Sequence, residues 1–101
     1  MRQTTLPEQT AKLIKLGFEK PKNRIVKRRF DRSTSSWIVV GEKSDYSIGE
    51  LIEMLGGVSE LEITRFGSGW EVGDDFRFCT NEELIDALYD MIIMIKEEGI
   101  I

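Results

Sequence analysis

The chain has 101 residues, of which 32% are charged and none is histidine, and it contains a single cysteine. The absence of histidine excludes Ser-His-Asp and Cys-His catalysis and Cys/His zinc sites, and one cysteine cannot form an internal disulfide. The longest apolar run, Met91–Ile95, is far shorter than the roughly 20 residues that span a bilayer, and the N-terminus has no apolar signal-peptide core. The composition therefore predicts one cytoplasmic domain with no enzymatic activity, no cofactor, no metal and no membrane contact.

The charges are divided unevenly between the two parts of the chain. Residues 1–43 contain 11 Lys/Arg and 4 Asp/Glu, a net charge of +7, whereas residues 44–101 contain 3 and 14, a net charge of −11. The whole chain therefore carries −4. Such asymmetry is compatible with an anionic partner, with self-association, or with neutralisation of one part by the other inside a single fold.

Three capping boxes predict three helices. In each box a Ser or Thr is followed three residues later by Glu, just before an apolar helical run. The boxes are Thr5–Glu8, Ser47–Glu50 and Thr80–Glu83. Pro7 suits the first turn of the first helix. Glycines, which readily adopt the left-handed conformation that ends helices, predict the three stops, at Gly17, at Gly56-Gly57 and, after about Glu98, at Gly99.

Strand patterns occupy the rest of the chain. Arg24–Phe30 and Ser36–Val40 flank a polar turn and predict a hairpin. Because Trp37–Val40 is apolar on both faces, we expect it to form a central strand. Further on, Leu61–Phe66 and Trp70–Val72 are joined by a glycine-rich loop, and a turn at Gly73–Asp75 precedes Phe76–Cys79. A continuous strand over Trp70–Cys79 with a bulge at Gly73 is the alternative.

The element order is thus αββαβββα. We expect residues 1–101 to form a single α+β domain with a mainly antiparallel sheet and helices packed on it. Strand order is not fixed by these patterns, because they say which neighbours pair and not how the two hairpins meet.

The first hairpin carries the densest charge. Seven of the 13 residues in Lys20–Arg32 are basic. One interpretation is a nucleic-acid-binding hairpin that follows a phosphate backbone through Lys27, Arg28, Arg29 and Arg32. The other is a solvated hairpin whose cations protect a sheet edge from aggregation, with Phe30 and Trp37 in the core. The acidity of the whole chain opposes non-specific nucleic-acid binding.

The last helix has a core-facing stripe and an acidic opposite face. The stripe consists of Leu84, Ala87, Leu88, Met91, Ile92 and Ile95. The opposite face consists of Glu82, Glu83, Asp86, Asp90 and Glu97. Ile93 lies within the acidic face, near Tyr89 and Met94, and these three side chains are the candidate protein interface. Plain solvent exposure of single apolar residues is the alternative.

Two smaller features have competing interpretations. Cys79 precedes the third capping box, where a helix dipole lowers a thiol pKa, but a small apolar side chain at a strand end is the simpler role. Asp74 and Asp75, with Glu71, offer hard oxygens to a divalent cation, but no calcium-loop spacing is present. We therefore expect the aspartate pair to stabilise a turn.

Parts of the chain resemble a known group of proteins. The segments Leu13–Phe18 and Glu83–Leu88, the latter continuing to Lys96–Ile100, together with Gly69-Trp70, resemble small uncharacterised proteins of bacterial prophages and mobile elements. The resemblance implies a bacterial cytoplasmic accessory protein and supplies no catalytic residues.

Taken together, the residues predict a non-enzymatic module that acts by contact with another protein or with a second copy of itself, as in a homodimer. The alternative is a nucleic-acid-binding accessory protein that uses the basic segment Lys20–Arg32.

Overall fold

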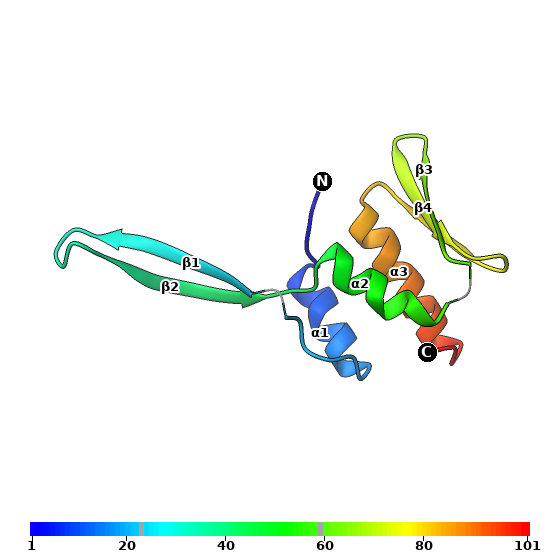
Figure 1. Ribbon diagram of the computed structural model, residues 1–101, viewed down its shortest axis with the longest axis horizontal. Helices are drawn as coiled ribbons and strands as arrows, with labels where there is room; N and C mark the ends of the chain where they lie inside the picture. Colours follow the sequence, from blue (N-terminus) through cyan, green and yellow to red (C-terminus); the bar gives the residue numbers. More distant parts are fainter. Residues whose placement is uncertain (23, 59) are drawn as a thin grey trace.

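The computed structural model describes residues 1–22, 24–58 and 60–101 and shows an α+β fold with three helices and two antiparallel sheets (Figure 1). The helices are α1 (Pro7–Lys15), α2 (Ile48–Met54), which continues into a 3₁₀ turn at Leu55–Gly57, and α3 (Leu84–Glu97). The strands are β1 (Arg24–Asp31), β2 (Ser36–Ser44), β3 (Glu62–Phe66), β4 (Gly69–Gly73) and β5 (Phe78–Asn81). The predicted fold class and element order are confirmed.

The two sheets are built differently. Strands β1 and β2 form a two-stranded sheet, with Phe30 opposite Trp37 and a bulge between Lys27 and Arg28. Strands β3, β4 and β5 form a second sheet in that order, with Ile63 opposite Val72 and Val72 opposite Cys79. The turn at Asp74 separates β4 from β5, so the alternative of one continuous strand over Trp70–Cys79 is wrong.

The core is centred on α3. Seven of its residues are buried: Leu84, Ile85, Ala87, Leu88, Met91, Ile92 and Ile95. The predicted stripe of six is therefore confirmed, with Ile85 added. The other buried apolar side chains are Leu13, Tyr46, Leu51, Leu55 and Val72. None of the described side chains of β1 or β2 belongs to this core, because Figure 1 shows their hairpin extending away from the helices.

Two of the three predicted capping boxes are wrong. The box at Ser47 is confirmed, since its hydroxyl accepts a hydrogen bond from the Glu50 amide and the Glu50 carboxylate accepts one from the Ser47 amide. Helix α1 is instead capped by Gln9, whose side chain accepts a hydrogen bond from the Leu6 amide. Helix α3 begins four residues after Thr80, which pairs with Glu71 in the sheet.

The glycine stops are confirmed at two of the helices. Gly17 and Gly99 have positive φ angles of 100° and 77°, in the region where an L side chain is strained. Each is the second residue after its helix, and the amide that follows it returns a hydrogen bond to the last turn.

Candidate functional site

Strands β1 and β2 form a projecting arm, defined here as residues 24–44. Its tip lies at the opposite end of the molecule from α3 and from the three-stranded sheet (Figure 1). The molecule is accordingly elongated, with extents of 59 × 32 × 19 Å. The basic arm and the acidic last helix are therefore at opposite ends, so the arm's charge is not neutralised by α3 within one chain.

Local hydrogen bonds close the tip of the arm. The Asp31 carboxylate accepts hydrogen bonds from the amide and the hydroxyl of Ser33 at 3.0 and 2.7 Å. These bonds lower the pKa of Asp31. Ser35 adopts a positive φ of 52°, and the hydroxyls of Thr34 and Ser36 are 2.8 Å apart. The tip is thus shaped by the polar residues that the sequence places there.

One face of the arm is apolar and open to solvent. Phe30 and Trp37 meet edge to face with their ring centroids 5.5 Å apart. Phe30, Trp37 and Val39 are nevertheless 46, 68 and 60% exposed. The prediction that Trp37–Val40 is a central strand is therefore wrong for Trp37 and Val39, as is the placement of Phe30 and Trp37 in the core. Among the described residues no second layer covers them, because the two-stranded arm extends away from the helices (Figure 1).

The four basic candidates all lie on the arm and all are exposed. Lys27, Arg28 and Arg29 belong to β1, and Arg32 belongs to the tip. Side chains alternate along a strand, so Arg28 shares the face of Phe30, Trp37 and Val39, while Lys27 and Arg29 lie on the opposite face. The structure thus brings these cations together on one element, next to exposed aromatic rings.

The other candidate interface residues lie on α3. Tyr89, Ile93 and Met94 are half-buried, and Tyr89 and Ile93 pack against the core. Burial, followed by the charges of Asp90 and Glu8, raises the pKa of Tyr89. These three side chains therefore present less free surface than the three exposed side chains of the arm.

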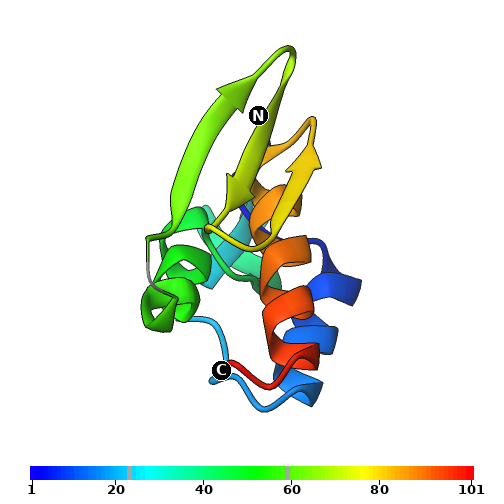
Figure 2. The same ribbon diagram turned by 90° about the vertical axis from the view of Figure 1, so that its right-hand side faces the viewer.

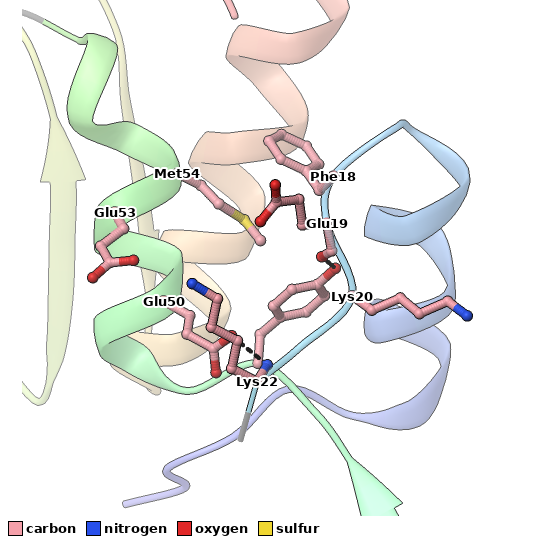
Figure 3. A pocket seen from close by; sticks show the side chains of 8 residues that line it. Phe18, Glu19, Lys20, Lys22, Glu50, Glu53 and Met54 are labelled. Atoms are coloured by element: carbon pink, nitrogen blue, oxygen red, sulfur yellow. Dashed lines mark hydrogen bonds between the residues drawn. The ribbon is translucent and has the colours of Figure 1, made fainter. Parts of the chain in front are cut away.

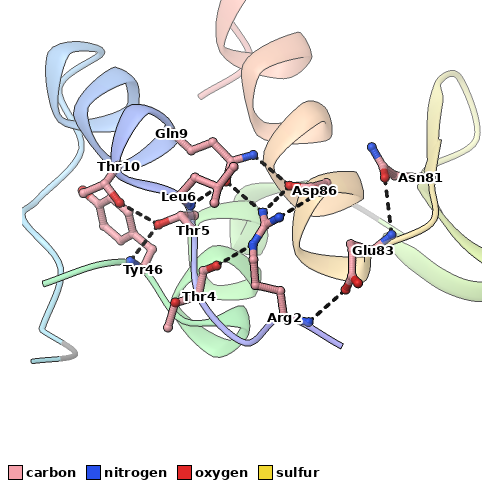
Figure 4. A network of polar contacts seen from close by, with 10 residues as sticks. All are labelled: Arg2, Thr4, Thr5, Leu6, Gln9, Thr10, Tyr46, Asn81, Glu83 and Asp86. Carbon is pink, nitrogen blue, oxygen red and sulfur yellow. Dashed lines mark hydrogen bonds and ion pairs between the residues drawn. The ribbon is translucent and has the colours of Figure 1, made fainter. Parts of the chain in front are cut away.

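The N-terminal segment is fixed to α3 by a polar network (Figure 4). The Arg2 guanidinium donates to Asp86 and, at 3.1 Å, to the Gln9 carbonyl oxygen, while the Gln9 amide donates to Asp86 at 2.8 Å. The Arg2 amide donates to the Glu83 carboxylate at 2.9 Å. Burial would raise the pKa of Asp86, but the hydrogen bonds from Arg2 and Gln9 and the charge of Arg2 outweigh it, so the pKa lies below the ordinary value.

Asp90 lies one turn further along α3, and its pKa is shifted in the opposite direction, above the ordinary value. Burial and the nearby charge of Asp86 raise its pKa, and a hydrogen bond with the Asn81 side chain only partly offsets them. The acidic face of α3 is thus partly neutralised by Arg2 at Asp86, whereas Asp90 and Glu97 remain exposed.

A second polar network joins the N-terminal segment to the start of α2. The buried Thr5 hydroxyl accepts a hydrogen bond from the Tyr46 amide at 3.0 Å and lies 2.7 Å from the Thr10 hydroxyl. The Thr10 hydroxyl donates to the buried Asp45 carboxylate at 2.6 Å. This buried role explains why Thr5 does not cap α1.

A small pocket lies between α2 and the segment that follows α1 (Figure 3). Its volume is about 220 Å³, below the roughly 300–1,000 Å³ of pockets that enclose small molecules. Its wall mixes Phe18 and Met54 with charges of both signs, Lys20 and Lys22 against Glu19, Glu50 and Glu53. The Tyr46 hydroxyl donates to the Glu19 carbonyl and the Lys22 amide donates to Glu50 at 3.0 Å, which ties the segment to α2. The pocket therefore has the features of a gap between packed segments and not those of a ligand-binding site.

Cys79 and Asp74 have structural roles. Cys79 is half-buried in β5 against the core, and burial followed by the charge of Asp90 raises the pKa of its thiol. The Asp74 carboxylate accepts hydrogen bonds from the amides of Phe76 and Arg77 at 2.8 and 2.9 Å, which confirms the predicted turn. Hydrogen bonds of this kind lower the pKa of Asp74.

The second sheet has an open face that the sequence analysis missed. Trp70, Val72 and Cys79 point toward the core, so by strand alternation Phe66, Glu71 and Phe78 lie on the opposite face. Phe66 and Phe78 are 64 and 61% exposed. The alternation of Phe78, Cys79 and Thr80 was the signal that could have revealed this face.

The described residues offer neither a cluster of metal ligands nor a membrane-spanning helix. Residues 1–22, 24–58 and 60–101 contain no group of three or more His, Cys, Asp and Glu residues that could hold a metal ion. Within the same ranges, no helix is both long and apolar enough to cross a bilayer.

Comparison with known proteins does not assign the chain to a family. No protein-family model, no curated protein and no solved structure matches the chain. The class of the protein is therefore defined by its own structure: a small α+β fold with a projecting two-stranded arm.

Proposed function

We propose that this protein is a non-enzymatic module that acts by contact with another protein chain, and that the arm is its contact element. The observation that supports this most directly is the apolar face of the arm. Phe30, Trp37 and Val39 lie together on it, and each is about half or more exposed. Contiguous exposed apolar side chains on a projecting element are typical of binding surfaces, whereas a solvated hairpin has no need of them.

On this view the main contact lies on the arm and not on α3. Tyr89, Ile93 and Met94 remain candidates for an additional contact, but they are half-buried. Aromatic residues and arginine are enriched at the energetic centres of protein interfaces. The arm offers Phe30, Trp37 and Arg28 on one face, so it has the composition of such a centre.

Sedimentation velocity over a wide range of protein concentration tests the proposal. We expect concentration-dependent association that is lost in the double variant Phe30→Ser/Trp37→Ser. Phe76→Ser is the matched control, because Phe76 is 87% exposed but lies in the turn between β4 and β5. Association that survives in the arm variant would contradict the proposal, because the arm would then not be the contact element.

Nucleic-acid binding is the second candidate function, and one observation favours it. Lys27, Arg28, Arg29 and Arg32 are all exposed on the same arm as the two aromatic rings, and bases stack on such rings. A labelled oligonucleotide bound at low salt, with an affinity that falls steeply as salt rises and on Lys27→Glu and Arg29→Glu, would support it. No binding at low salt would exclude it.

A further inference from the structure

The three-stranded sheet has one covered and one uncovered face. Figure 2 shows α3 running past the sheet, and Val72 and Cys79 pack toward it. The opposite face carries Phe66 at one end and Phe78 at the other. Between them lies a row of paired residues, Thr64, Glu71 and Thr80, in the order β3, β4, β5.

Two glycines lie beside the exposed rings on this face. Gly69 pairs with Phe66, and Gly73 pairs with Phe78, so each ring has a neighbour without a side chain. A Cβ at position 73 would lie 2.7 Å from the Phe78 Cβ, so the two paired residues approach closely and position 73 has no room for a side chain. A sheet face with two exposed rings next to glycines is suited to packing against another β surface.

The arm and this open face complement each other chemically. The apolar face of the arm carries Phe30, Trp37 and Val39 with one cation, Arg28. The open face carries Phe66 and Phe78 with the carboxylate of Glu71 between them, and a second carboxylate, Glu62, on the same side. Apolar groups therefore match apolar groups, and a positive charge matches negative charges.

A single chain does not make this contact. Figure 1 places the arm and the sheet at opposite ends of the molecule, with α1 and α2 between them. We propose that the arm of one copy packs on the open face of the three-stranded sheet of a second copy, and that the second copy returns the same contact. This inference rests on the proposed function and names the partner and the receptor surface.

The area is sufficient for a reciprocal dimer. An aromatic side chain buries roughly 150–250 Å², so the exposed parts of Phe30, Trp37, Phe66 and Phe78 supply roughly 450 Å² per contact. Two such contacts around a twofold axis bury about 1,000 Å² once Val39, Arg28 and Glu71 are added, which is near the lower limit for a specific interface. Association is therefore expected to be reversible and concentration-dependent.

Charge exchange between Arg28 and Glu71 tests the contact. We expect Arg28→Glu and Glu71→Arg each to weaken association at least about tenfold, because each places like charges opposite one another. The double variant Arg28→Glu/Glu71→Arg restores the pairing with its direction reversed, so its association should return toward that of the unmodified protein. Sedimentation equilibrium at moderate ionic strength gives all four dissociation constants.

Arg29→Glu is the matched control. It makes the same charge change on the neighbouring residue, but Arg29 lies on the other face of the arm, opposite Ile38. It should leave the dissociation constant within about twofold of the unmodified value. Phe66→Ser should weaken association without any change of charge.

The outcomes separate this inference from the proposed function. If Phe30→Ser/Trp37→Ser abolishes association while Glu71→Arg and Phe66→Ser do not affect it and the double variant is not restored, the arm binds elsewhere. The inference is then wrong and the proposed function stands. If the arm variants leave association unchanged, both are wrong. A protein that stays monomeric at high concentration overturns the inference, and oligonucleotide binding by that monomer would identify nucleic acid as the partner.

Discussion

Substituting one valine in each sheet by alanine measures how little the arm contributes to the stability of the core. Val39 in β2 is 60% exposed and Val72 in β4 is fully buried. Replacing either by Ala removes the same two carbons from a strand, so the loss of intrinsic strand preference is similar at both sites. The difference between the two variants therefore reports burial.

The expected costs differ several-fold. Two buried methyl groups at Val72 correspond to about 1.6 kcal/mol of transfer free energy, and the cavity they leave raises the cost of Val72→Ala to about 2–3 kcal/mol. At Val39 only the buried two fifths of the side chain contributes, so Val39→Ala should cost about 0.6 kcal/mol or less. A domain of this length is stabilised by about 5–15 kcal/mol in total, so the first loss is large and the second is minor.

Urea denaturation followed by circular dichroism gives the free energy of unfolding of both variants, with the protein kept dilute so that it is monomeric. Thermal unfolding should agree, with a midpoint lowered by about 10 °C or more for Val72→Ala and by a few degrees at most for Val39→Ala. Equal losses for the two variants would refute the reasoning, because the arm would then be packed as tightly as the core.

Three further predictions concern the turn, the N-terminal network and the tryptophans. Gly73→Ala should cost about 1–3 kcal/mol of unfolding free energy, because the new Cβ would lie 2.6 Å from the Arg77 carbonyl oxygen. Gly56→Ala is the control and should be close to neutral, because no atom lies within 4 Å of its new Cβ. Equal effects of the two substitutions would contradict the steric argument. The lowered pKa of Asp86 stabilises the fold above its unfolded-state pKa of about 3.9, and this stability is lost as the pH falls through the folded-state pKa. Asp86→Asn should therefore lower stability at neutral pH by about 1–2 kcal/mol and reduce the acid sensitivity of urea unfolding, and an unchanged pH profile would count against it. In the single-tryptophan variant Trp70→Phe, the fluorescence of the exposed Trp37 should change with protein concentration. In Trp37→Phe, the fluorescence of the half-buried Trp70 should change mainly on unfolding. A Trp37 signal that does not depend on concentration would argue against an arm contact.

Most of the element order could be predicted because its signals are local. The reciprocal hydrogen bonds of Ser47 and Glu50 connect residues three apart, and the left-handed conformations of Gly17 and Gly99 depend only on the missing side chain. The apolar stripe of α3 also follows from the sequence, since one helix face repeats every three to four residues.

Two capping boxes failed because tertiary contacts used the same residues. The Thr5 hydroxyl is buried against Thr10 and the Tyr46 amide, and Thr80 belongs to a strand opposite Glu71. A Ser or Thr hydroxyl three residues before Glu can cap a helix, but it can also form other hydrogen bonds. A partner distant in sequence can therefore prevent the capping box from forming.

The candidate site was predicted only in part. The cations of the arm were identified from their density. Phe30 and Trp37 were assigned to a core as aromatic side chains, and Trp37–Val40 was assigned to a central strand because apolar residues on both faces of a strand usually indicate burial. The same pattern is expected of a strand that is covered by a partner, and one chain's sequence does not distinguish the two. Phe66 and Phe78 were missed because the burial of their sheet depends on which face α3 occupies.

None of the described side chains of the arm is buried in the core, which separates the residues that build the scaffold from those proposed to bind a partner. Among the described residues, those that hold the helices together and those that face outward on the arm form two different sets. If the arm binds a partner as proposed, substitutions at residues 26–39 should alter the choice of partner at little cost to the scaffold. Evolution is free to diversify the arm while the scaffold stays constant, and an engineer could replace its outward residues in the same way.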